Sequence, residues 1–228
     1  MNLFFDRIVV ANLARRPDRL AAAKAQFTSP AWPFIAPHVF VSADGMQNPP
    51  PAGWNGTAGD WGNLQTHAAI TRHAVAAGYC ALLILEDDFI LTPGFAAKVS
   101  DFLAFVPRDW DGIALGGNHC RPPTLKGAGV VQCVKSSENH AYAVRGGLLK
   151  ALSEAYGAGD ASAGTIWPEM QARFRVYAPS RWLIGQSAGQ SDVSKSGGNK
   201  PERFYDHALP ISPTASSPNQ HRFTPTHL

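Results

Sequence analysis

Cysteine is scarce in this sequence, and the cysteines it has are far apart. The 228 residues contain three of them, at Cys80, Cys120 and Cys133. A disulfide framework needs a denser, even set, and a structural zinc site needs closely spaced pairs. We therefore expect neither feature, and we expect a reducing, cytoplasmic compartment. Cys80 lies in an apolar run and is predicted to be a small buried hydrophobic residue.

Long hydrophobic runs are also missing. No apolar stretch approaches the ~20 residues that are needed to cross a bilayer. Residues 1–14 carry Asp6 and Arg7 within their apolar segment, which is not the basic, apolar and small-residue order of a signal peptide. We expect a protein without a transmembrane segment.

Neither sign of charge dominates. Twenty Lys and Arg against 17 Asp and Glu give a net charge of +3, and the pI is about 8.8. This excess is too small to indicate nucleic-acid binding by itself, but it suits a polyanionic ligand such as a nucleotide diphosphate. The content of 45% hydrophobic and 16% charged residues is that of a folded protein. We expect one domain over 1–208 and a loosely ordered tail over 209–228.

Strand-like and helix-like segments alternate in the first half of the chain. Strands are predicted at 5–13, 34–42, 79–85, 110–115, 130–134, 140–144, 174–177 and 182–184, and helices at 19–27, 62–77, 93–105 and 145–156. This alternation predicts an α/β fold with a mainly parallel central sheet and helices on both faces. Ligands of such sheets bind beyond the carboxyl ends of the strands.

Charged residues follow three of the predicted strands. The arginines 15, 16 and 19 follow the first strand, Asp44 the second, and the acids 86–88 the third. These clusters should converge at one edge of the sheet. For each arginine alone, a solvated helix start is an equally good interpretation, and Asp44-Gly45 could be a simple turn.

Three consecutive acids, Glu86, Asp87 and Asp88, end the apolar segment LLIL. Adjacent carboxylates repel one another at a partly desolvated strand end, so a cation is expected to neutralise them. Mg²⁺ or Mn²⁺ takes one or two carboxylates together with water and substrate phosphate. In an extended chain Glu86 and Asp88 would point to one side and Asp87 to the other. A solvated turn or a helix N-cap is the alternative interpretation.

Four segments together resemble glycosyltransferase family 25, which includes bacterial lipooligosaccharide galactosyltransferases and the collagen galactosyltransferases. They are 9–19 (VVANLARRPDR), 62–67 (GNLQTH), 83–88 (LILEDD) and 140–149 (HAYAVRGGLL), and 190–193 (QSDV) is a weaker match. The family has Cys where this chain has Asn63, and Ser where it has Thr66. The resemblance implies a GT-A fold, a nucleotide-sugar-binding α/β sandwich. It also implies transfer of a hexose, expected from a UDP-sugar, to a carbohydrate or other hydroxyl acceptor with inversion, as in lipopolysaccharide biosynthesis.

Site residues follow from the motifs and from the resemblance. Asp88 and Glu86 are the predicted metal ligands, with His207 as a possible late ligand. The predicted donor-binding residues are Asn12, Arg16, Arg19, Asp44, His67, Glu86 and Asp87. A lone helical histidine such as His67 is more often structural.

An inverting transfer needs a general base. Asp192, Asp160 and Glu169 are candidates, with Asp192 favoured.

Other activities stay open at this point. A metal-dependent nucleotidyltransferase or phosphohydrolase would share acids after a strand, although no Gly-rich phosphate loop is present. A non-catalytic binding module is a second possibility. A nucleic-acid acceptor is a third, because 195–203 and the histidines near the end could follow a phosphate backbone.

Overall fold

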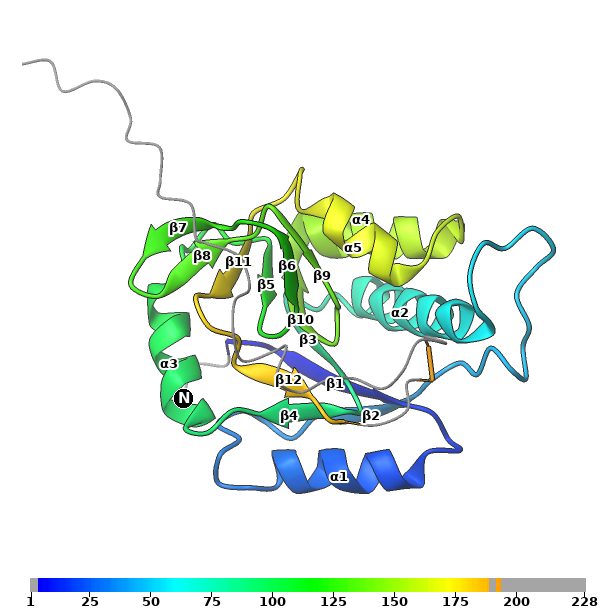
Figure 1. Cartoon of the computed structure of the whole chain (residues 1–228), viewed down its shortest axis with the longest axis horizontal. Helices are drawn as coiled ribbons and strands as arrows, with labels where there is room; N and C mark the ends of the chain where they lie inside the picture. The colour runs from blue at the N-terminus through cyan, green and yellow to red at the C-terminus, as the bar shows by residue number, and fades with distance from the viewer. Residues whose placement is uncertain (1–3, 189–191, 194–228) are drawn as a thin grey trace, which may run out of the picture.

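The computed structural model describes residues 4–188 and 192–193. A large central sheet has helices on both faces, and two small sheets flank it (Figure 1). The helices are α1 (Pro17–Phe27), α2 (Ala58–Ala76), α3 (Phe95–Phe105), α4 (Gly146–Ala158) and α5 (Ala163–Met170). The strands are β1 (Arg7–Asn12), β2 (His38–Val41), β3 (Ala81–Glu86), β4 (Phe89–Leu91), β5 (Gly112–Ala114), β6 (Asn118–Arg121), β7 (Thr124–Gly127), β8 (Val130–Gln132), β9 (Lys135–Ser137), β10 (Ala141–Arg145), β11 (Val176–Pro179) and β12 (Ile184–Gln186). The predicted boundary between 1–208 and 209–228 lies outside the described residues.

The large sheet has eight strands in the order β2-β1-β3-β10-β5-β11-β8-β7. Strand β1 pairs in parallel with β2 and β3, and β5 pairs in parallel with β11. The other pairings are antiparallel. The predicted α/β class is confirmed, but the sheet is mixed rather than mainly parallel. Parallel neighbours need a crossover, usually a helix. Between β5 and β10 the chain instead forms the short strands β6 to β9 and no helix. Strand β10 then lies next to β5 in the large sheet.

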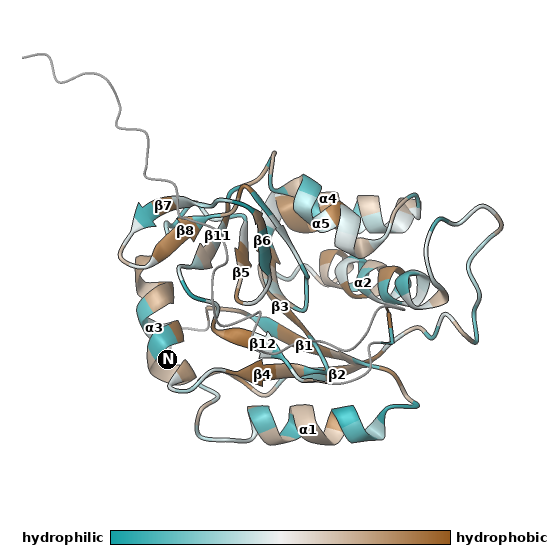
Figure 2. Cartoon of the chain, in the orientation of Figure 1, coloured by the Kyte–Doolittle hydropathy of each residue, from teal (hydrophilic) through white to brown (hydrophobic). Residues whose placement is uncertain are grey.

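Central strands are apolar on both faces because both faces are covered. In β1, Val9 and Ala11 pack with α2, α4 and α5, whereas Ile8 and Val10 pack on the other face with residues of α1 and α3. Strand β3 divides in the same way. Figure 2 shows these strands as hydrophobic while the outer helix faces are mixed. Each large apolar side chain that is fully buried contributes roughly 1.5–3 kcal/mol to the free energy of unfolding. The two cores therefore fix the position of the central strands and of their ends.

Helix α2 starts earlier than the periodicity predicted, at Ala58 rather than at residue 62. Thr57 caps the helix by accepting a hydrogen bond from Asp60 N, and the Asp60 side chain accepts one from Thr57 N. This reciprocal cap satisfies two amides that would otherwise lack partners. Two glycines then let the helix approach its neighbours. A Cβ on Gly62 would lie 2.7 Å from Ala43 O, and one on Gly59 would lie 2.1 Å from Asp192 O.

Several elements were not expected from the sequence. Strands β4, β6, β7 and β9 are short, and apart from β4 they are largely polar. Helix α5 contains Pro168 in its interior, a residue that normally argues against a helix. The prediction for Cys80 was wrong. Cys80 is exposed where the chain enters β3, and Cys133 is the buried cysteine.

No helix within the described residues is long and apolar enough to cross a membrane.

Candidate functional site

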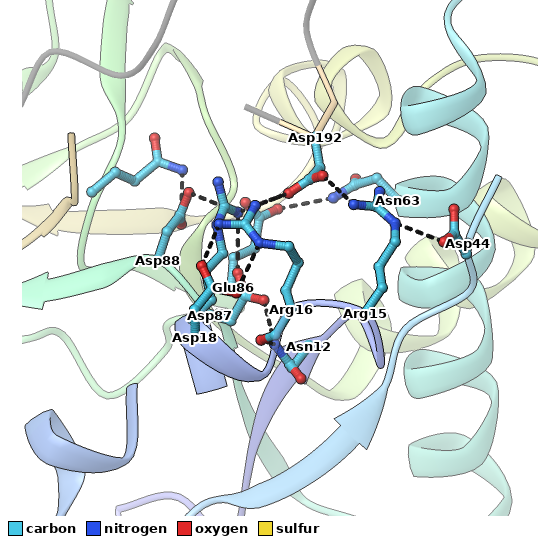
Figure 3. A network of polar contacts seen from close by, with 12 residues as sticks. Asn12, Arg15, Arg16, Asp18, Asp44, Asn63, Glu86, Asp87, Asp88 and Asp192 are labelled. Atoms are coloured by element: carbon cyan, nitrogen blue, oxygen red, sulfur yellow. Dashed lines mark hydrogen bonds and ion pairs between the residues drawn. The ribbon is translucent and has the colours of Figure 1, made fainter. Parts of the chain in front are cut away.

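The site lies at the carboxyl edge of β1, β2 and β3. Parallel pairing places Ala11 beside Glu86 and Asn12 beside Val41, so the segments that follow these strands meet. Figure 3 shows the polar side chains of the three segments directed toward one another. The predicted convergence of the arginines, Asp44 and the acidic triplet is therefore confirmed as geometry.

Asp192 ties the arginines together. Arg15 donates to Asp192 at 2.7 Å and to Asp44 at 2.8 Å, so it spans from the second strand end to the C-terminal segment. Arg16 also contacts Asp192 and pairs with Asp18 at 2.8 Å. Arg19 lies 3.6 Å from Asp192. Three guanidinium groups thus gather around one carboxylate, which is a density of cationic donors that suits phosphate oxygens.

The three acids of the triplet face three different partners. Glu86 turns toward α2, where Asn63 donates to it at 3.0 Å. Asp87 accepts from Asn12 at 2.6 Å and from Arg19 at 3.2 Å. Strand β3 ends at Glu86, and the next two residues form a turn into β4. The predicted alternation therefore does not turn Asp87 away from the site.

Asp88 is the most buried acid of the triplet by side-chain exposure. Gln186 of β12 donates to it at 3.3 Å, and Arg19 lies 3.6 Å away. Burial, together with the negative charge of Glu86, raises the pKa of Asp88 to about 7. Burial also raises the pKa of Asp87 in spite of its bond from Asn12. The local positive charge is therefore too small for the carboxylates present, and an added cation would stabilise their ionised form.

His67 is fully buried in α2 and has a structural partner. Its Nδ1 bonds the hydroxyl of Tyr142 at 2.8 Å, and its Nε2 lies 3.6 Å from Glu86. Burial acts to raise the pKa of Glu86, but His67 and then Asn63 hold it below its usual value. His67 thus stabilises the Glu86 carboxylate from the side of α2.

Two cavities meet at Glu86. The first, of about 70 Å³, lies over the ends of β1 and β2 and is lined by Arg15, Asp44 and Asp87 among others. The second, of about 230 Å³, lies between the triplet, the link from β9 to β10 and the start of α5. Arg19, Asn63, Glu86, Asp192 and Val193 line both cavities. The shared residues make the two cavities parts of one site.

The candidate bases have different surroundings. Asp192 lines both cavities, and although burial acts to raise its pKa, the hydrogen bonds from Arg15 and Arg16 hold it below its usual value. A carboxylate held this way is a weak proton acceptor. Asp160 and Glu169 are exposed and line neither cavity. His207 lies outside the described residues.

Four residues of the site were not predicted as functional. Asn63 lies one helical turn before His67, so its position on the same face could have indicated it. Gln186, Glu138 and Asn139 reach the second cavity from later strands and loops. No local motif marks them, because only the tertiary fold brings these segments to the triplet.

The described residues supply only some of the ligands that a divalent cation needs. Within residues 4–188 and 192–193, no group of three or more His, Cys, Asp or Glu side chains could hold a metal ion. Glu86 and Asp88 nevertheless line the same cavity and offer carboxylate oxygens. Mg²⁺ and Mn²⁺ are hard ions that keep water and substrate phosphate as ligands besides one or two carboxylates. The donor set therefore fits such an ion when a phosphate ligand is also bound.

Comparison with known proteins identifies the fold. A scan against family models finds no match, and a search of curated proteins finds none. Among solved structures, the chain resembles a glycosyltransferase involved in the glycosylation of the major capsid of PBCV-1, with a TM-score of 0.51 and 9% identity over 82% of this chain and 94% of that one. The chain therefore shares an α/β fold with that protein. At this identity the likeness concerns the fold alone, so the specific resemblance to family 25 stays a prediction.

Two further structures are more distant. The chain matches mannose-1-phosphate geranyltransferase from Thermus thermophilus with a TM-score of 0.42, at 13% identity over 78% of this chain and 74% of that one. It matches UDP-glucose pyrophosphorylase complexed with UDP-glucose with a TM-score of 0.40, at 10% identity over 76% and 72%.

Proposed function

We propose that this protein is a metal-dependent glycosyltransferase that transfers a hexose from a nucleotide-sugar donor, expected to be a UDP-sugar, to a hydroxyl group. The observation that carries the proposal is the pair of cavities that meet at Glu86. Two arginines and four acids line the first cavity, one arginine and five acids line the second, and both cavities lie at the carboxyl edge of the parallel strands. Ligands of open α/β sheets bind at this edge. The shared fold with a glycosyltransferase agrees with the assignment.

The first cavity would hold the nucleotide. Asp44, at the end of β2, would bind the base or ribose. The diphosphate would take the guanidinium donors of Arg15, Arg16 and Arg19, which now face Asp192 and Asp87. A phosphate group competes well for these donors, since it accepts several charge-assisted hydrogen bonds at once. Asn12 would act indirectly by holding Asp87.

Glu86 and Asp88 would hold a divalent cation together with the diphosphate oxygens. When bound, Mn²⁺ or Mg²⁺ supplies charge stabilisation of the departing nucleoside diphosphate. The residues of this chain then do the rest. His67 and Asn63 keep Glu86 oriented, Gln186 orients Asp88, and Arg19 places positive charge between the two cavities. Inversion of the anomeric centre would require the acceptor to approach from the second cavity.

The second cavity favours an uncharged acceptor. Its ionisable lining includes one guanidinium, from Arg19, and five acids, namely Asp60, Glu86, Asp88, Glu138 and Asp192. A phosphate-bearing acceptor would meet repulsion there. A sugar or other alcohol would meet hydrogen-bond acceptors. This observation favours a carbohydrate hydroxyl over a nucleic acid as the acceptor.

Product analysis tests the proposal. The full chain would be incubated with UDP-glucose, UDP-galactose or GDP-mannose, with Mn²⁺ or with EDTA and in the presence or absence of pyrophosphate, and the released phosphorus compounds separated. A glycosyltransferase releases the nucleoside diphosphate and leaves the sugar on an alcohol or on water. A nucleotidyltransferase run in reverse consumes pyrophosphate and forms a nucleoside triphosphate. The proposal predicts diphosphate release that EDTA abolishes. Triphosphate formation, or no reaction with any donor, would overturn it.

Asp88→Asn and Asp101→Asn make a matched pair for this assay. Both substitutions remove one carboxylate charge, but Asp101 is exposed on α3 and lies outside both cavities. Asp88→Asn should lose metal-dependent release, and Asp101→Asn should keep it. Equal activity of the two variants would remove Asp88 from the site.

A further inference from the structure

A buried hydrogen bond joins α2 to β10 next to the site. Nδ1 of His67 lies 2.8 Å from the hydroxyl of Tyr142, and both side chains are fully buried. Neither residue lines either cavity, so neither is placed to touch a ligand there. Burying polar groups costs free energy unless they are hydrogen-bonded, and apolar side chains would fill the same space without that cost. A role beyond packing would explain why a polar pair lies here.

Strand pairing places Tyr142 and Glu86 on the same face of the sheet. Tyr142 of β10 is the register partner of Ile84 in β3. Glu86 follows Ile84 by two positions, so their side chains point to the same face. Trp167 of α5 packs on Tyr142, with ring centroids 4.6 Å apart. His67 reaches this face from α2, where its Nδ1 contacts Tyr142 and its Nε2 lies 3.6 Å from Oε1 of Glu86.

One oxygen of Glu86 is held from the side of α2. Asn63 donates to Oε1 at 3.0 Å, and Nε2 of His67 faces the same oxygen. Nε2 is buried without a hydrogen-bond partner among the described residues, and Oε1 lies just beyond hydrogen-bonding distance from it. With Oε1 facing α2, Oε2 is the oxygen that remains for a cation in the cavities that Glu86 lines.

The hydrogen bond at Nδ1 bears on which ring nitrogen of His67 carries the proton. A neutral imidazole has one donor and one acceptor nitrogen, a carboxylate only accepts, and a tyrosine hydroxyl can do either. If the proton is on Nε2, His67 donates toward Glu86, and Nδ1 accepts from the Tyr142 hydroxyl. If the proton is on Nδ1, the lone pair of Nε2 faces the carboxylate and the two repel. A donor at Nδ1 therefore supports the tautomer that suits Glu86.

We propose that Tyr142 is a positioning residue of the metal site: its hydroxyl donates to Nδ1 of His67, keeps the proton on Nε2, and thereby fixes the Glu86 carboxylate for the divalent cation. The part that concerns the cation rests on the proposed function, whereas the tautomer of His67 does not. Groups that hold a metal ligand from behind set its orientation, and their loss typically costs about 10–100-fold in metal affinity.

Nuclear magnetic resonance of the free protein tests the tautomer. Long-range ¹H–¹⁵N spectra of histidine-labelled wild type distinguish a protonated ring nitrogen from an unprotonated one. His67→Gln identifies the signals of His67 by their loss. We expect Nε2 to be protonated and Nδ1 to be unprotonated at neutral pH. A proton on Nδ1, or on both nitrogens, would make the Tyr142 hydroxyl the acceptor and overturn the proposal, while the proposed function would stand.

A metal titration with two matched variants tests the effect on the cation. Tyr142→Phe removes the hydroxyl and keeps the ring. Tyr177→Phe is the control, because Tyr177 is a buried tyrosine of β11 that lines neither cavity and whose hydroxyl donates to Asp109 at 3.4 Å. At a saturating concentration of UDP, and in parallel of GDP, Mn²⁺ is added and the melting temperature is recorded. The Mn²⁺ concentration that gives half of the rise is compared between the variants.

Tyr142→Phe should raise the half-saturating Mn²⁺ concentration by ~10-fold or more, whereas Tyr177→Phe should leave it unchanged. Binding of the nucleoside diphosphate without Mn²⁺ should be the same in both variants. A purely structural role would lower the melting temperature of the free protein without changing the Mn²⁺ requirement. If the two variants need equal concentrations of Mn²⁺, Tyr142 only packs in the core, and the proposed function stands.

A double variant tests whether Tyr142 acts through His67. Glutamine has no tautomers, and its side-chain amide can donate toward Glu86 in place of Nε2. In the His67→Gln background, Tyr142→Phe should therefore change the half-saturating Mn²⁺ concentration by less than about twofold, because the two changes affect one interaction and are not additive. An undiminished effect of Tyr142→Phe in that background would show that Tyr142 does not act through His67.

Failure of the proposed function has a different signature. If the wild type shows no Mn²⁺-dependent rise in melting temperature with either nucleotide, the proposed function fails, and the role of Tyr142 at the metal site fails with it. The spectrum of His67 is recorded on the free wild type. It can therefore contradict the tautomer even if Tyr142→Phe or the double variant does not fold.

Discussion

The two cavities that meet at Glu86 differ in the charges on their walls and in how those charges are balanced. In the first, the cationic side chains of Arg15 and Arg19 are paired with Asp44, Asp87 and Asp192. In the second, five acids face one arginine. The first cavity can exchange an internal carboxylate for a phosphate, whereas the second is suited to a cation and a neutral alcohol. This difference separates the role of binding the donor from the role of activating the acceptor.

The largest expected effect comes from removing the most buried acid of the triplet, in the second cavity. Asp88→Asn should lower turnover by ~10³-fold, because it weakens the electrostatic stabilisation of the leaving group, for which losses of about 10²–10³ per group are typical. The nucleotide alone, without metal, should still bind. Steady-state kinetics with a Mn²⁺ titration measure turnover, and calorimetric titration without metal measures the binding. If Asp88→Asn instead abolished metal-free nucleotide binding and left turnover intact, the assignment of roles to the two cavities would be reversed.

Arg19 lines both cavities, so its substitution should affect both of them. It contacts Asp87 at 3.2 Å, and Asp88 and Asp192 at 3.6 Å. Arg19→Ala should weaken donor binding by about 10–100-fold, since hydrogen bonds to charged groups contribute roughly 1.5–3 kcal/mol. Lys24→Ala on the exposed face of α1 is the control and should change little. Calorimetric titration with a nucleoside diphosphate checks the effect, and equal affinities for the two variants would contradict it.

A glycine in α2 keeps the Asp192 segment against the first cavity. A Cβ at Gly59 would lie 2.1 Å from Asp192 O and 2.7 Å from Val193 Cα, so the segment would have to move. Gly59→Ala should destabilise the protein by about 1–3 kcal/mol through overpacking. It should also weaken donor binding, because Asp192 would no longer organise the arginines. Denaturant unfolding and calorimetric titration measure the two effects.

The control for Gly59→Ala carries the smallest expected effect. A Cβ at Gly157, near the end of α4, would meet nothing within 4 Å. Gly157→Ala should therefore raise the free energy of unfolding by up to about 1 kcal/mol, through the higher helix propensity of alanine. Donor binding should not change. If Gly157→Ala were as destabilising as Gly59→Ala, the close approach at Gly59 would not be the cause of the loss.

The first cavity could be predicted in large part from the sequence, whereas the second could not. Strand β3 is a continuous apolar run, and α1 begins at Pro17 before an Ala-rich segment. Both elements could be predicted from these patterns, and with them the positions at which β1 to β3 end. Parallel strands then bring Asp44 and the triplet together by topology alone. That argument depends on local patterns that are strong.

The second cavity is built by segments with weak local signals. Helix α5 contains Gly164 and Pro168, and β9 is a three-residue polar strand. The pairing of Arg15 with Asp192 joins residues 177 positions apart, which no spacing encodes. Because the sequence does not show these arginine contacts, it favoured Asp192 as the general base. In the structure, three arginines surround Asp192 and make it a weak proton acceptor. Glu138 stood in no motif, and only the fold places it on the wall of the second cavity.

A thermal-shift panel tests the central claim most directly, the claim that the carboxyl edge of β1 to β3 binds a nucleotide sugar together with a divalent cation. Wild type and Asp88→Asn would be melted with UDP-, GDP-, CMP- and dTDP-sugars, each with and without Mn²⁺. A ligand that binds only the folded state raises the melting temperature. We predict that one nucleotide sugar stabilises the wild type strongly with Mn²⁺ and that Asp88→Asn loses the metal-dependent part. The absence of any shift in every combination would contradict the account.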